Sequence, residues 1–278
     1  MPLIGYQQND VRFIGELEED RVYPVGSVTD FYSGRATTAV RENGGLARAE
    51  LTEVPFVPET SRIFCVGINY HSHADEARDA TGFDIPKFPM VFGRWQQSLV
   101  TDGTPVPVPP REEGLDWEVE LAVVIKDTVW LADKETALDH VMGYCVFNDL
   151  SARNKQLATP QFTLGKNADR SGPIGPALFR PNEIGDVYDL EVQTRVNGEV
   201  MQRANTRDLI HKIEDIIVYI TDTVTLLPGD VIATGTPGGV GLGQTPPRYL
   251  KPGDVVETEI SSLGMLRTPI VAREDLDR

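Results

Sequence analysis

Residues 117–125 read Trp-Glu-Val-Glu-Leu-Ala-Val-Val-Ile, and this stretch decides what kind of fold the chain can adopt. A run rich in valine, leucine and isoleucine is typical of a buried β-strand. Because side chains alternate along a strand, Glu118 and Glu120 point to one side, roughly 7 Å apart. The apolar residues at the odd positions of 119–125 supply the opposite face, which predicts a strand that borders a hydrophobic core.

The two carboxylates on this strand constrain what lies beside them. A buried pair must be accompanied by protons, basic side chains or a metal, because an unpaired buried carboxylate is costly. An all-oxygen site suits a hard divalent ion such as Mg²⁺. Asp149 follows an expected strand and could supply a third carboxylate, although such an Asp commonly caps a turn. A second interpretation stays open, an edge strand with Glu118 and Glu120 in water, because Glu is mostly exposed.

The composition of the 278 residues excludes several classes of protein. With 42 acidic and 26 basic residues the formal charge is −16, which argues against a nucleic-acid partner or an anionic membrane surface. Cys65 and Cys145 lie in apolar runs typical of buried free thiols, so no disulfide framework is expected. No apolar run reaches eighteen residues, and residues 1–10 lack a basic region followed by an apolar core. These features predict a cytoplasmic protein without a membrane partner.

Proline and glycine divide the chain into many short segments. Residues 1–57 are predicted to form a small N-terminal domain of short strands, and residues 58–278 the main domain. In the main domain, strands are expected over residues 62–67 and 144–147, while the proline-rich residues 104–110 form an extended connector. Pro-Gly-Asp turns break the remainder into further short strands. This organisation favours a mixed, mainly β fold.

Two helices are predicted from the spacing of apolar residues. One is a short helix that Asp133 would cap, with apolar side chains at residues 137–142. The other starts at Thr206 and places isoleucines on one face over residues 210–220. The isoleucine face would press on a sheet.

Half of the histidines in the chain stand together, at His71 and His73. If a helical turn begins there, His73 and Glu76 are three residues apart on one face and can form a hydrogen bond. The carboxylate would orient the imidazole and raise its basicity, so that His73 could take a proton from water. The alternative is a solvated loop with a chance pair of histidines.

Other polar residues are weaker candidates when they are considered singly. The glycine-rich residues 234–241 expose N–H groups and hydroxyls that could hold a substrate carboxylate, although such segments are usually only turns. The segment is neither a dinucleotide fingerprint nor a phosphate loop. Arg153, Gln156 and Lys166 would each be expected at the surface.

Taken in order, these segments resemble the fumarylacetoacetate hydrolase superfamily from about residue 62 to residue 271. The resemblance is to its acylpyruvase-like and 2-hydroxyhepta-2,4-diene-1,7-dioate isomerase-like members. The motifs that carry it are Phe64-Cys65-Val66-Gly67-Ile68-Asn69-Tyr70 with His73 and Glu76, Asp116-Trp117-Glu118-Val119-Glu120-Leu121, Gly143-Tyr144, Asn148-Asp149, Ser151-Ala152-Arg153, Gly165-Lys166, Gly175-Pro176, Asn197-Gly198-Glu199 with Gln202, Pro228-Gly229-Asp230-Val231-Ile232, and Thr234-Gly235-Thr236-Pro237.

The resemblance implies a fold, a metal site and a substrate class. The implied fold is the family's β-sandwich roll with flanking short helices and a small N-terminal domain, usually as a homodimer. The implied metal ligands are Glu118, Glu120 and Asp149, which would hold Mg²⁺ or Mn²⁺, with Ca²⁺ as another ion that the site can accept. The implied partner is a small 2-oxo acid.

The resemblance also implies a mechanism. The substrate would chelate the metal through its carboxylate and ketone oxygens. The residues that would place it are Arg153, Gln156, Gly235 and Thr236. His73, oriented by Glu76, would activate a water that attacks a second carbonyl, and Lys166 would help to stabilise the resulting pyruvate-type enolate.

Two positions depart from the family's pattern. Arg94 stands where relatives commonly have Lys, and residues 167–169 read Asn-Ala-Asp where Ser-Phe-Asp is usual. The planar fork of an Arg pairs a carboxylate bidentately, so Arg94 is predicted to bind a second anionic group at the far end of the substrate. The alternative is a surface Arg.

The expected function is therefore hydrolysis of a C–C bond in a 2,4-dioxo acid of the acylpyruvate type, in the catabolism of aromatic or sugar-derived compounds. Two alternatives use the same enolate, decarboxylation of oxaloacetate and isomerisation or decarboxylation of an unsaturated dicarboxylic 2-oxo acid. The His73 and Glu76 pair favours hydrolysis, because water activation is the step that only the hydrolase needs. A metal-binding protein without turnover is a third class.

Overall fold

The structure is a computed structural model, and it describes residues 1–41, 44–81, 85 and 87–276. Short strands outnumber helices in these residues, which confirms the mixed, mainly β fold. The strands are β1 (Leu3–Gln8), β2 (Val11–Glu18), β3 (Arg21–Ser27), β4 (Leu46–Ala47), β5 (Thr52–Val54), β6 (Ile63–Gly67), β7 (Met90–Arg94), β8 (Leu99–Val100), β9 (Val106–Pro107), β10 (Leu115–Asp116), β11 (Val119–Ile125), β12 (Val141–Asn148), β13 (Ser151–Ala152), β14 (Gly172–Phe179), β15 (Glu191–Val196), β16 (Glu199–Asn205), β17 (Val231–Ala233), β18 (Val255–Ile260) and β19 (Gly264–Val271). The α-helices are α1 (Val28–Tyr32), α2 (His71–Thr81), α3 (Arg153–Gln156), α4 (Thr163–Lys166), α5 (Pro181–Ile184) and α6 (Ile213–Thr221).

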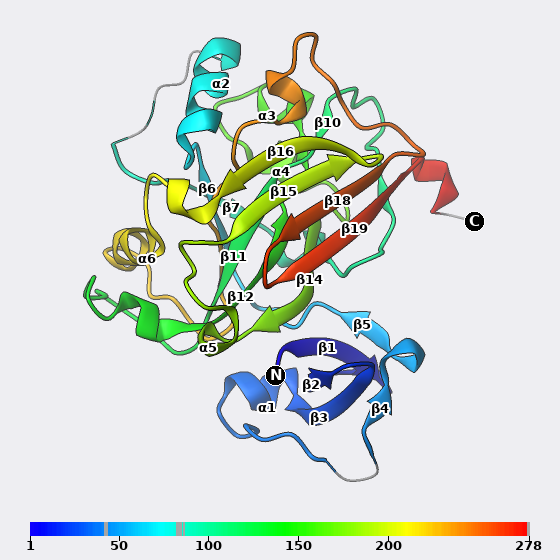
Figure 1. The fold of residues 1–278 in the computed structure, drawn as a ribbon, viewed down its shortest axis with the longest axis vertical. Helices are drawn as coiled ribbons and strands as arrows, with labels where there is room; N and C mark the ends of the chain where they lie inside the picture. Colours follow the sequence, from blue (N-terminus) through cyan, green and yellow to red (C-terminus); the bar gives the residue numbers. More distant parts are fainter. Residues whose placement is uncertain (42–43, 82–84, 86, 277–278) are drawn as a thin grey trace.

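Two large sheets organise the described strands. The larger runs β4-β3-β2-β1-β14-β12-β11-β17-β6-β7, with β5 paired to β1 and β8 to β14. The second runs β16-β15-β18-β19-β9, and β10 pairs with β13. Figure 1 shows the second sheet lying across β11, β12 and β14. Apolar side chains fill the space between the sheets, among them Leu121 of β11, Val192 of β15 and Leu266 of β19.

Strand β11 lies inside the larger sheet, between β12 and β17. Its odd-numbered residues, 119–125, pack on the second sheet and on the isoleucine face of α6, as predicted. Its even-numbered residues beyond Glu120 pack with the buried free thiols of Cys65 and Cys145. Glu118 and Glu120 continue this second face, and only 5% and 2% of their surfaces are exposed. The interpretation as an edge strand in water is therefore wrong.

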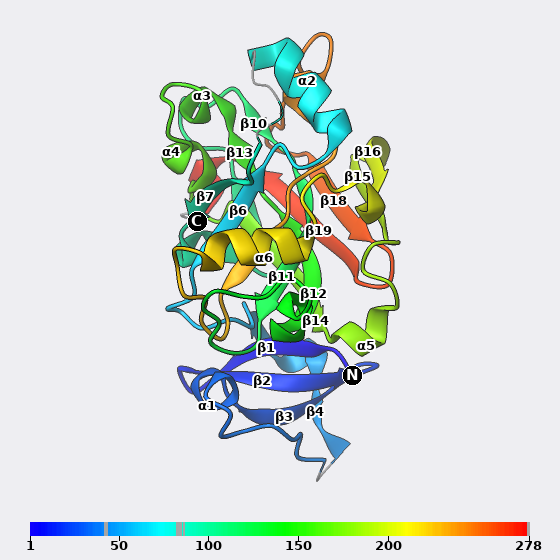
Figure 2. The same ribbon diagram turned by 90° about the vertical axis from the view of Figure 1, so that its left-hand side faces the viewer.

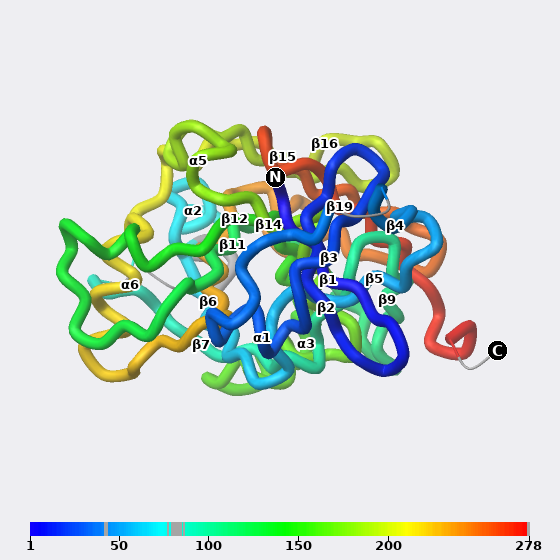
Figure 3. The backbone as a smooth tube through the Cα atoms, turned by 90° about the horizontal axis from the view of Figure 1, so that it is seen from below, coloured from blue at the N-terminus to red at the C-terminus, as the bar shows by residue number. Residues whose placement is uncertain are grey.

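Residues 1–57 contain β1 to β5 and α1, which form a layer at one end of the molecule (Figures 1 and 2). The pairing of Leu3 with Leu178 joins β1 of this layer to β14. Figure 3 shows these N-terminal strands from below, nearest to the viewer. Helix α2 lies at the opposite end of the molecule (Figure 2). The division into two domains at residue 57 stays a prediction.

The helix predicted from Thr206 begins later than expected. A short 3-10 turn covers Thr206–Asp208, and α6 begins only at Ile213. Between them, the backbone and side-chain oxygens of Asn69 accept the N–H groups of Ile210 and His211 at 2.9 and 2.7 Å, which keeps the chain extended. The isoleucine face of α6 is buried, as the spacing predicts.

The helix predicted behind Asp133 is only a 3-10 turn, Ala137–His140. Val141 already pairs with Ile125, so the pairing of β12 with β11 ends the turn. Asp133 does not cap the turn, because its carboxylate accepts a hydrogen bond from the N–H of Glu135 at 2.9 Å.

The other predicted segments agree with the structure. The strands expected over residues 62–67 and 144–147 are β6 and β12. The proline-rich residues 104–110 contribute only the two-residue strand β9, at the edge of the second sheet. No helix in the described part of the chain is long and apolar enough to cross a membrane.

Candidate metal centre and pocket

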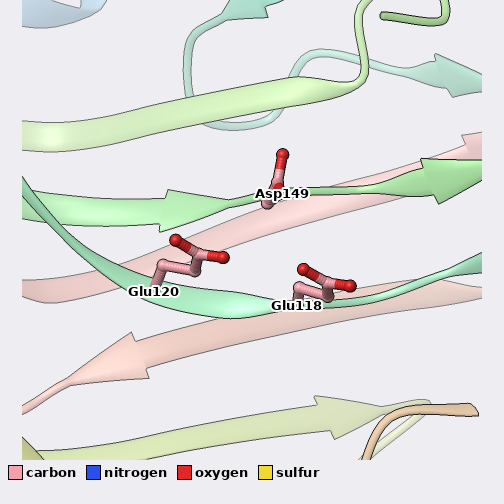
Figure 4. Close-up of side chains that lie close together, drawn as sticks. All are labelled: Glu118, Glu120 and Asp149. Carbon is pink, nitrogen blue, oxygen red and sulfur yellow. The ribbon is translucent and has the colours of Figure 1, made fainter. Parts of the chain in front are cut away.

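Three buried carboxylates meet where β11 begins and β12 ends. Glu118 and Glu120 point to the same side of β11, and Asp149 follows β12 on the neighbouring strand (Figure 4). The pairing of Val119 with Asn148 places these positions opposite one another. Each of the three side chains offers an oxygen within 4.8 Å of the others. The structure therefore brings together the predicted metal ligands.

One oxygen of each carboxylate is held by a donor of the protein. The donors are Arg153 Nη1 to Glu118 Oε1 at 2.7 Å, the Gly235 N–H to Glu120 Oε2 at 2.8 Å, and Arg94 Nε and Nη2 to Asp149 Oδ1 at 2.8 and 2.6 Å. Each carboxylate is thereby fixed in orientation and keeps its second oxygen for another partner. Such outer contacts orient metal ligands in proteins.

Lys166 lies beside two of these second oxygens. Its Nζ donates to Glu118 Oε2 at 2.8 Å and to Asp149 Oδ2 at 2.6 Å. Burial alone would lower the pKa of Lys166, but the two carboxylates raise it. Lys166 is therefore an ammonium ion enclosed among carboxylates.

Glu118 and Glu120 differ in how the fold compensates their charge. Burial is the largest influence on both and raises a carboxyl pKa. For Glu118, the positive charges of Lys166 and Arg153 outweigh burial and lower the pKa to about 2. For Glu120, burial and the two neighbouring carboxylates raise the pKa well above its ordinary value.

The residues fit a divalent cation. The donor set is made of carboxylate oxygens, which hard ions such as Mg²⁺ and Mn²⁺ prefer. Among the described residues Glu120 forms no ion pair, and burial with the two neighbouring carboxylates raises its pKa although the charge of Lys166 lowers it. A bound divalent ion would offset the repulsion among the three carboxylates.

His73 and Glu76 lie on the first turns of α2, so the predicted helical turn is present. His73 Nδ1 and Glu76 Oε2 are 3.7 Å apart, which is longer than a hydrogen bond, and both atoms are buried without another partner in the described part of the chain. Glu76 Oε1 accepts the N–H of Gly239 at 2.7 Å, so the carboxylate is anchored beside the imidazole. His71, in contrast, is exposed at the start of the helix.

A pocket of about 60 Å³ connects this pair to the carboxylates. A single water needs roughly 10–15 Å³ by the same measure, so the pocket accepts a small molecule. Most of the predicted site residues line it: His73, Glu76, Glu118, Glu120, Arg153, Gln156, Lys166 and Thr236. Arg153 Nη2 is buried and has no hydrogen-bond partner among the residues that the structure describes. The remaining wall is largely apolar, and it includes Met90, Phe92 and Phe162.

Arg94 does not have the predicted substrate-binding position. Its side chain is fully buried, and its five N–H groups are all used inside the protein. Besides Asp149, it donates to Ser98 Oγ at 3.2 Å, Ser171 Oγ at 2.7 Å and the Leu150 carbonyl at 2.9 Å. Arg94 is therefore a structural support for Asp149, and the prediction that its fork binds substrate is wrong.

Gly235 also has a contact inside the protein that was not predicted. Its N–H donates to Glu120, and Gly235 is not among the described residues that line the pocket. It therefore orients Glu120, a predicted metal ligand, and its contact with a substrate carboxylate stays a prediction. Thr236, the next residue, does line the pocket.

Asp116 and Gln202 are two buried residues of the site that the sequence did not predict as site residues. Asp116 accepts from Arg153 Nε at 2.8 Å and from the N–H groups of Gly241 and Leu242 at 2.7 and 3.0 Å, so it ties Arg153 to the loop beside it. A signal for Asp116 exists in the sequence, because it continues the alternation of residues 118 and 120.

Gln202 supports the pocket from the second sheet. Its Nε2 donates to Thr236 Oγ1 at 2.8 Å, and its Oε1 accepts the N–H of Val119 at 3.2 Å. No local pattern around Gln202 indicates these contacts, which depend on how the two sheets pack.

The fold and site together define three buried carboxylates, which fit a divalent cation, beside a small-molecule pocket. A family model described as fumarylacetoacetate (FAA) hydrolase, C-terminal, matches residues 62–271. The chain belongs to this family, which confirms the resemblance of its motifs, and it is an enzyme of the fumarylacetoacetate hydrolase superfamily.

Curated relatives and solved structures agree with this assignment. Oxaloacetate tautomerase FAHD2A, mitochondrial, of Bos taurus is 40% identical over 228 residues, which are 81% of this chain and 71% of the relative. A fumarylacetoacetate hydrolase from Exiguobacterium antarcticum has a TM-score of 0.85 at 32% identity, covering 98% of this chain and 100% of that chain. A 2-hydroxyhepta-2,4-diene-1,7-dioate isomerase from Mycobacterium marinum has a TM-score of 0.79 at 29% identity, covering 98% and 99%. These structures confirm the expected fold, including the N-terminal β region.

Proposed function

We propose that this protein is a divalent-metal-dependent enzyme that interconverts the keto and enol forms of a 2-oxo acid, with oxaloacetate as the first substrate to test. The observation that carries the proposal is that one small pocket joins the three-carboxylate centre to a histidine with an anchored carboxylate behind it. The name of the relatives that are 40% identical supports tautomerisation as the reaction.

Different residues of the chain would bind the substrate and transfer the proton in such a reaction. When bound, a divalent ion polarises the ketone oxygen and stabilises the enolate. Arg153 Nη2, which has no hydrogen-bond partner among the described residues, is available to donate to a substrate carboxylate, next to Gln156 and Thr236. His73 would take the proton from the carbon beside the ketone, and the enolate oxygen would then receive a proton from the imidazolium or from water. Glu76, 3.7 Å from Nδ1, would stabilise the imidazolium.

Hydrolysis of a 2,4-dioxo acid is the second candidate function. The buried His73 and Glu76 pair favours it, because a base at the pocket can activate water as well as take a proton from carbon. The fumarylacetoacetate hydrolase with 32% identity supports this reaction type. Both candidates share the enolate, so they differ only in the step that precedes or follows it.

Three assays on one preparation distinguish the candidates. With Mg²⁺ present, loss of enol absorbance from oxaloacetate without pyruvate formation indicates tautomerisation, and pyruvate formation from oxaloacetate indicates decarboxylation. Release of pyruvate from 2,4-dioxopentanoate indicates hydrolysis. Glu118→Ala is the control for each rate. If the wild type accelerates none of the three reactions above this control, the proposed function is refuted.

A further inference from the structure

Lys166 holds the two carboxylate oxygens that a metal would need. Its Nζ lies 2.8 Å from Glu118 Oε2 and 2.6 Å from Asp149 Oδ2. The other oxygen of each carboxylate is occupied by Arg153 or Arg94, so the oxygens on Lys166 are the ones left for an ion. The Lys166 side chain is 2% exposed, so water contributes little to its solvation.

A divalent ion would compete with the ammonium group for these oxygens. Mg²⁺ binds oxygen at about 2.0–2.1 Å and Ca²⁺ at about 2.3–2.6 Å. Because Nζ lies 2.6 Å from Asp149 Oδ2, a Mg²⁺ ion in contact with this oxygen would lie within about 4.7 Å of Nζ. Two cations at such a separation in a buried site repel one another, which favours displacement of one of them.

The chain allows Lys166 to be the group that moves. Arg153 and Arg94 bind the opposite oxygens and can stay in place. Lys166 is the last residue of α4, its four-carbon stem is flexible, and it lines the pocket. Its ammonium group can thus turn into the pocket while α4 keeps its position.

We propose that Lys166 is the counter-ion of the metal-free centre, and that a divalent ion displaces its ammonium group from Glu118 and Asp149 into the pocket. The displaced group would then be free to bind a substrate oxygen. Lys166 would thereby become available only when metal is present, so metal would bind before substrate. This exchange is independent of which 2-oxo acid the enzyme uses.

Chemical labelling of the full-length wild type tests the displacement. Acetylation by an N-hydroxysuccinimide ester, with and without MgCl₂, is followed by peptide mass spectrometry. We expect Lys166 to react at least tenfold faster with Mg²⁺, because its amine leaves the buried carboxylates. Lys155 is exposed on α3 and should react equally in both conditions. Equal or slower labelling of Lys166 with Mg²⁺ would overturn the proposal.

Metal affinity gives a second test that needs no turnover. Titration calorimetry should show that Lys166→Met binds Mg²⁺ at least tenfold more tightly than the wild type, because no ammonium group has to be displaced. Lys155→Met is the matched control and should keep the wild-type affinity. Unchanged or weaker binding by Lys166→Met would contradict the exchange. Neither result depends on activity, so the test stands apart from the proposed reaction.

Discussion

The pKa values of Glu118 and Glu120 shift in opposite directions in the same buried site. The pKa of Glu118 is lowered to about 2, so its ionised form stabilises the fold above its ordinary pKa, and this contribution is lost as the pH falls toward 2. The pKa of Glu120 is raised, so its contribution is present below its ordinary pKa and is lost as the pH rises through the raised pKa. Above its ordinary pKa, Glu120 is therefore the group whose ionisation strains the metal-free protein.

Replacing Glu120 should relieve this strain. In metal-free protein, Glu120→Gln should not melt below the wild type, and its advantage should grow as the pH rises from the ordinary pKa of Glu120 toward its raised pKa, because glutamine cannot ionise. Differential scanning calorimetry in chelator, at several pH values, measures both melting temperatures. A clear drop in the Tm of the variant would count against mutual repulsion in the pair.

The two neighbouring histidines provide a matched comparison. His73 lines the pocket and His71 is exposed, so His73→Ala should lower kcat by roughly a hundredfold or more, while His71→Ala should cost much less. Steady-state kinetics on the active substrate, with Mg²⁺ affinity as a second readout, tests this. Comparable losses in the two variants would remove His73 as the base.

Arg94 should act on stability and not on substrate choice. Arg94→Met removes one of the two cations that pair with the buried Asp149 and leaves only Lys166, which should cost up to roughly 3–5 kcal/mol of the free energy of unfolding. Arg273→Met removes an exposed ion pair with Asp169 and should cost under about 1 kcal/mol. Denaturant unfolding measures both. A selective rise in KM for dicarboxylic substrates, with stability unchanged, would restore the substrate-binding role.

At the scale of elements, the loop after β17 joins the larger sheet to the metal centre. Gly235 has a φ of +104°, and a Cβ there would lie 2.7 Å from Asn69 Cβ and 3.0 Å from the Val66 carbonyl oxygen. Only glycine therefore lets the backbone N–H reach Glu120.

Gly235→Ala should consequently both destabilise the protein and weaken Mg²⁺ binding. Gly253 is a matched control, because its φ is +98° but a Cβ there would meet nothing within 4 Å. Gly253→Ala should show only the backbone cost of roughly 1–3 kcal/mol and normal metal affinity. If the two variants lose equal stability in denaturant and bind Mg²⁺ equally, the close packing around Gly235 contributes neither to stability nor to Mg²⁺ binding.

At the scale of the whole molecule, the metal centre lies between segments that are far apart in the sequence. An ion that binds only the folded state stabilises it by mass action. Free Mg²⁺ at a hundred times its Kd contributes about 2.7 kcal/mol, which should raise the Tm by roughly 5 °C in a chain of this size.

Glu118→Ala removes one ligand and should abolish both turnover and this rise in Tm. Thermal scans with Mg²⁺ and with chelator make the comparison. An equal rise in the wild type and in the variant would show that the ion acts elsewhere. The homodimer implied by the family resemblance stays a prediction, which light scattering after gel filtration would test.

Local periodicity and short motifs were enough to predict much of this protein. The alternation over residues 117–125 specified β11, its two faces and the shared direction of Glu118 and Glu120. The spacing of His73 and Glu76 specified the first turns of α2. These features depend on neighbouring residues, whose geometry is set by the repeat of a strand or a helix.

Only the tertiary structure decided which partners surround the carboxylates. Arg94 binds Asp149 across 55 residues, and Gly235 binds Glu120 across 115 residues, so no local pattern distinguishes these contacts from a surface Arg or an ordinary turn. The late start of α6 likewise follows from hydrogen bonds to Asn69, which is 142 residues from His211. Burial and pairing between distant segments determine which polar groups are satisfied inside the protein, and hence which remain free to bind a metal or a substrate.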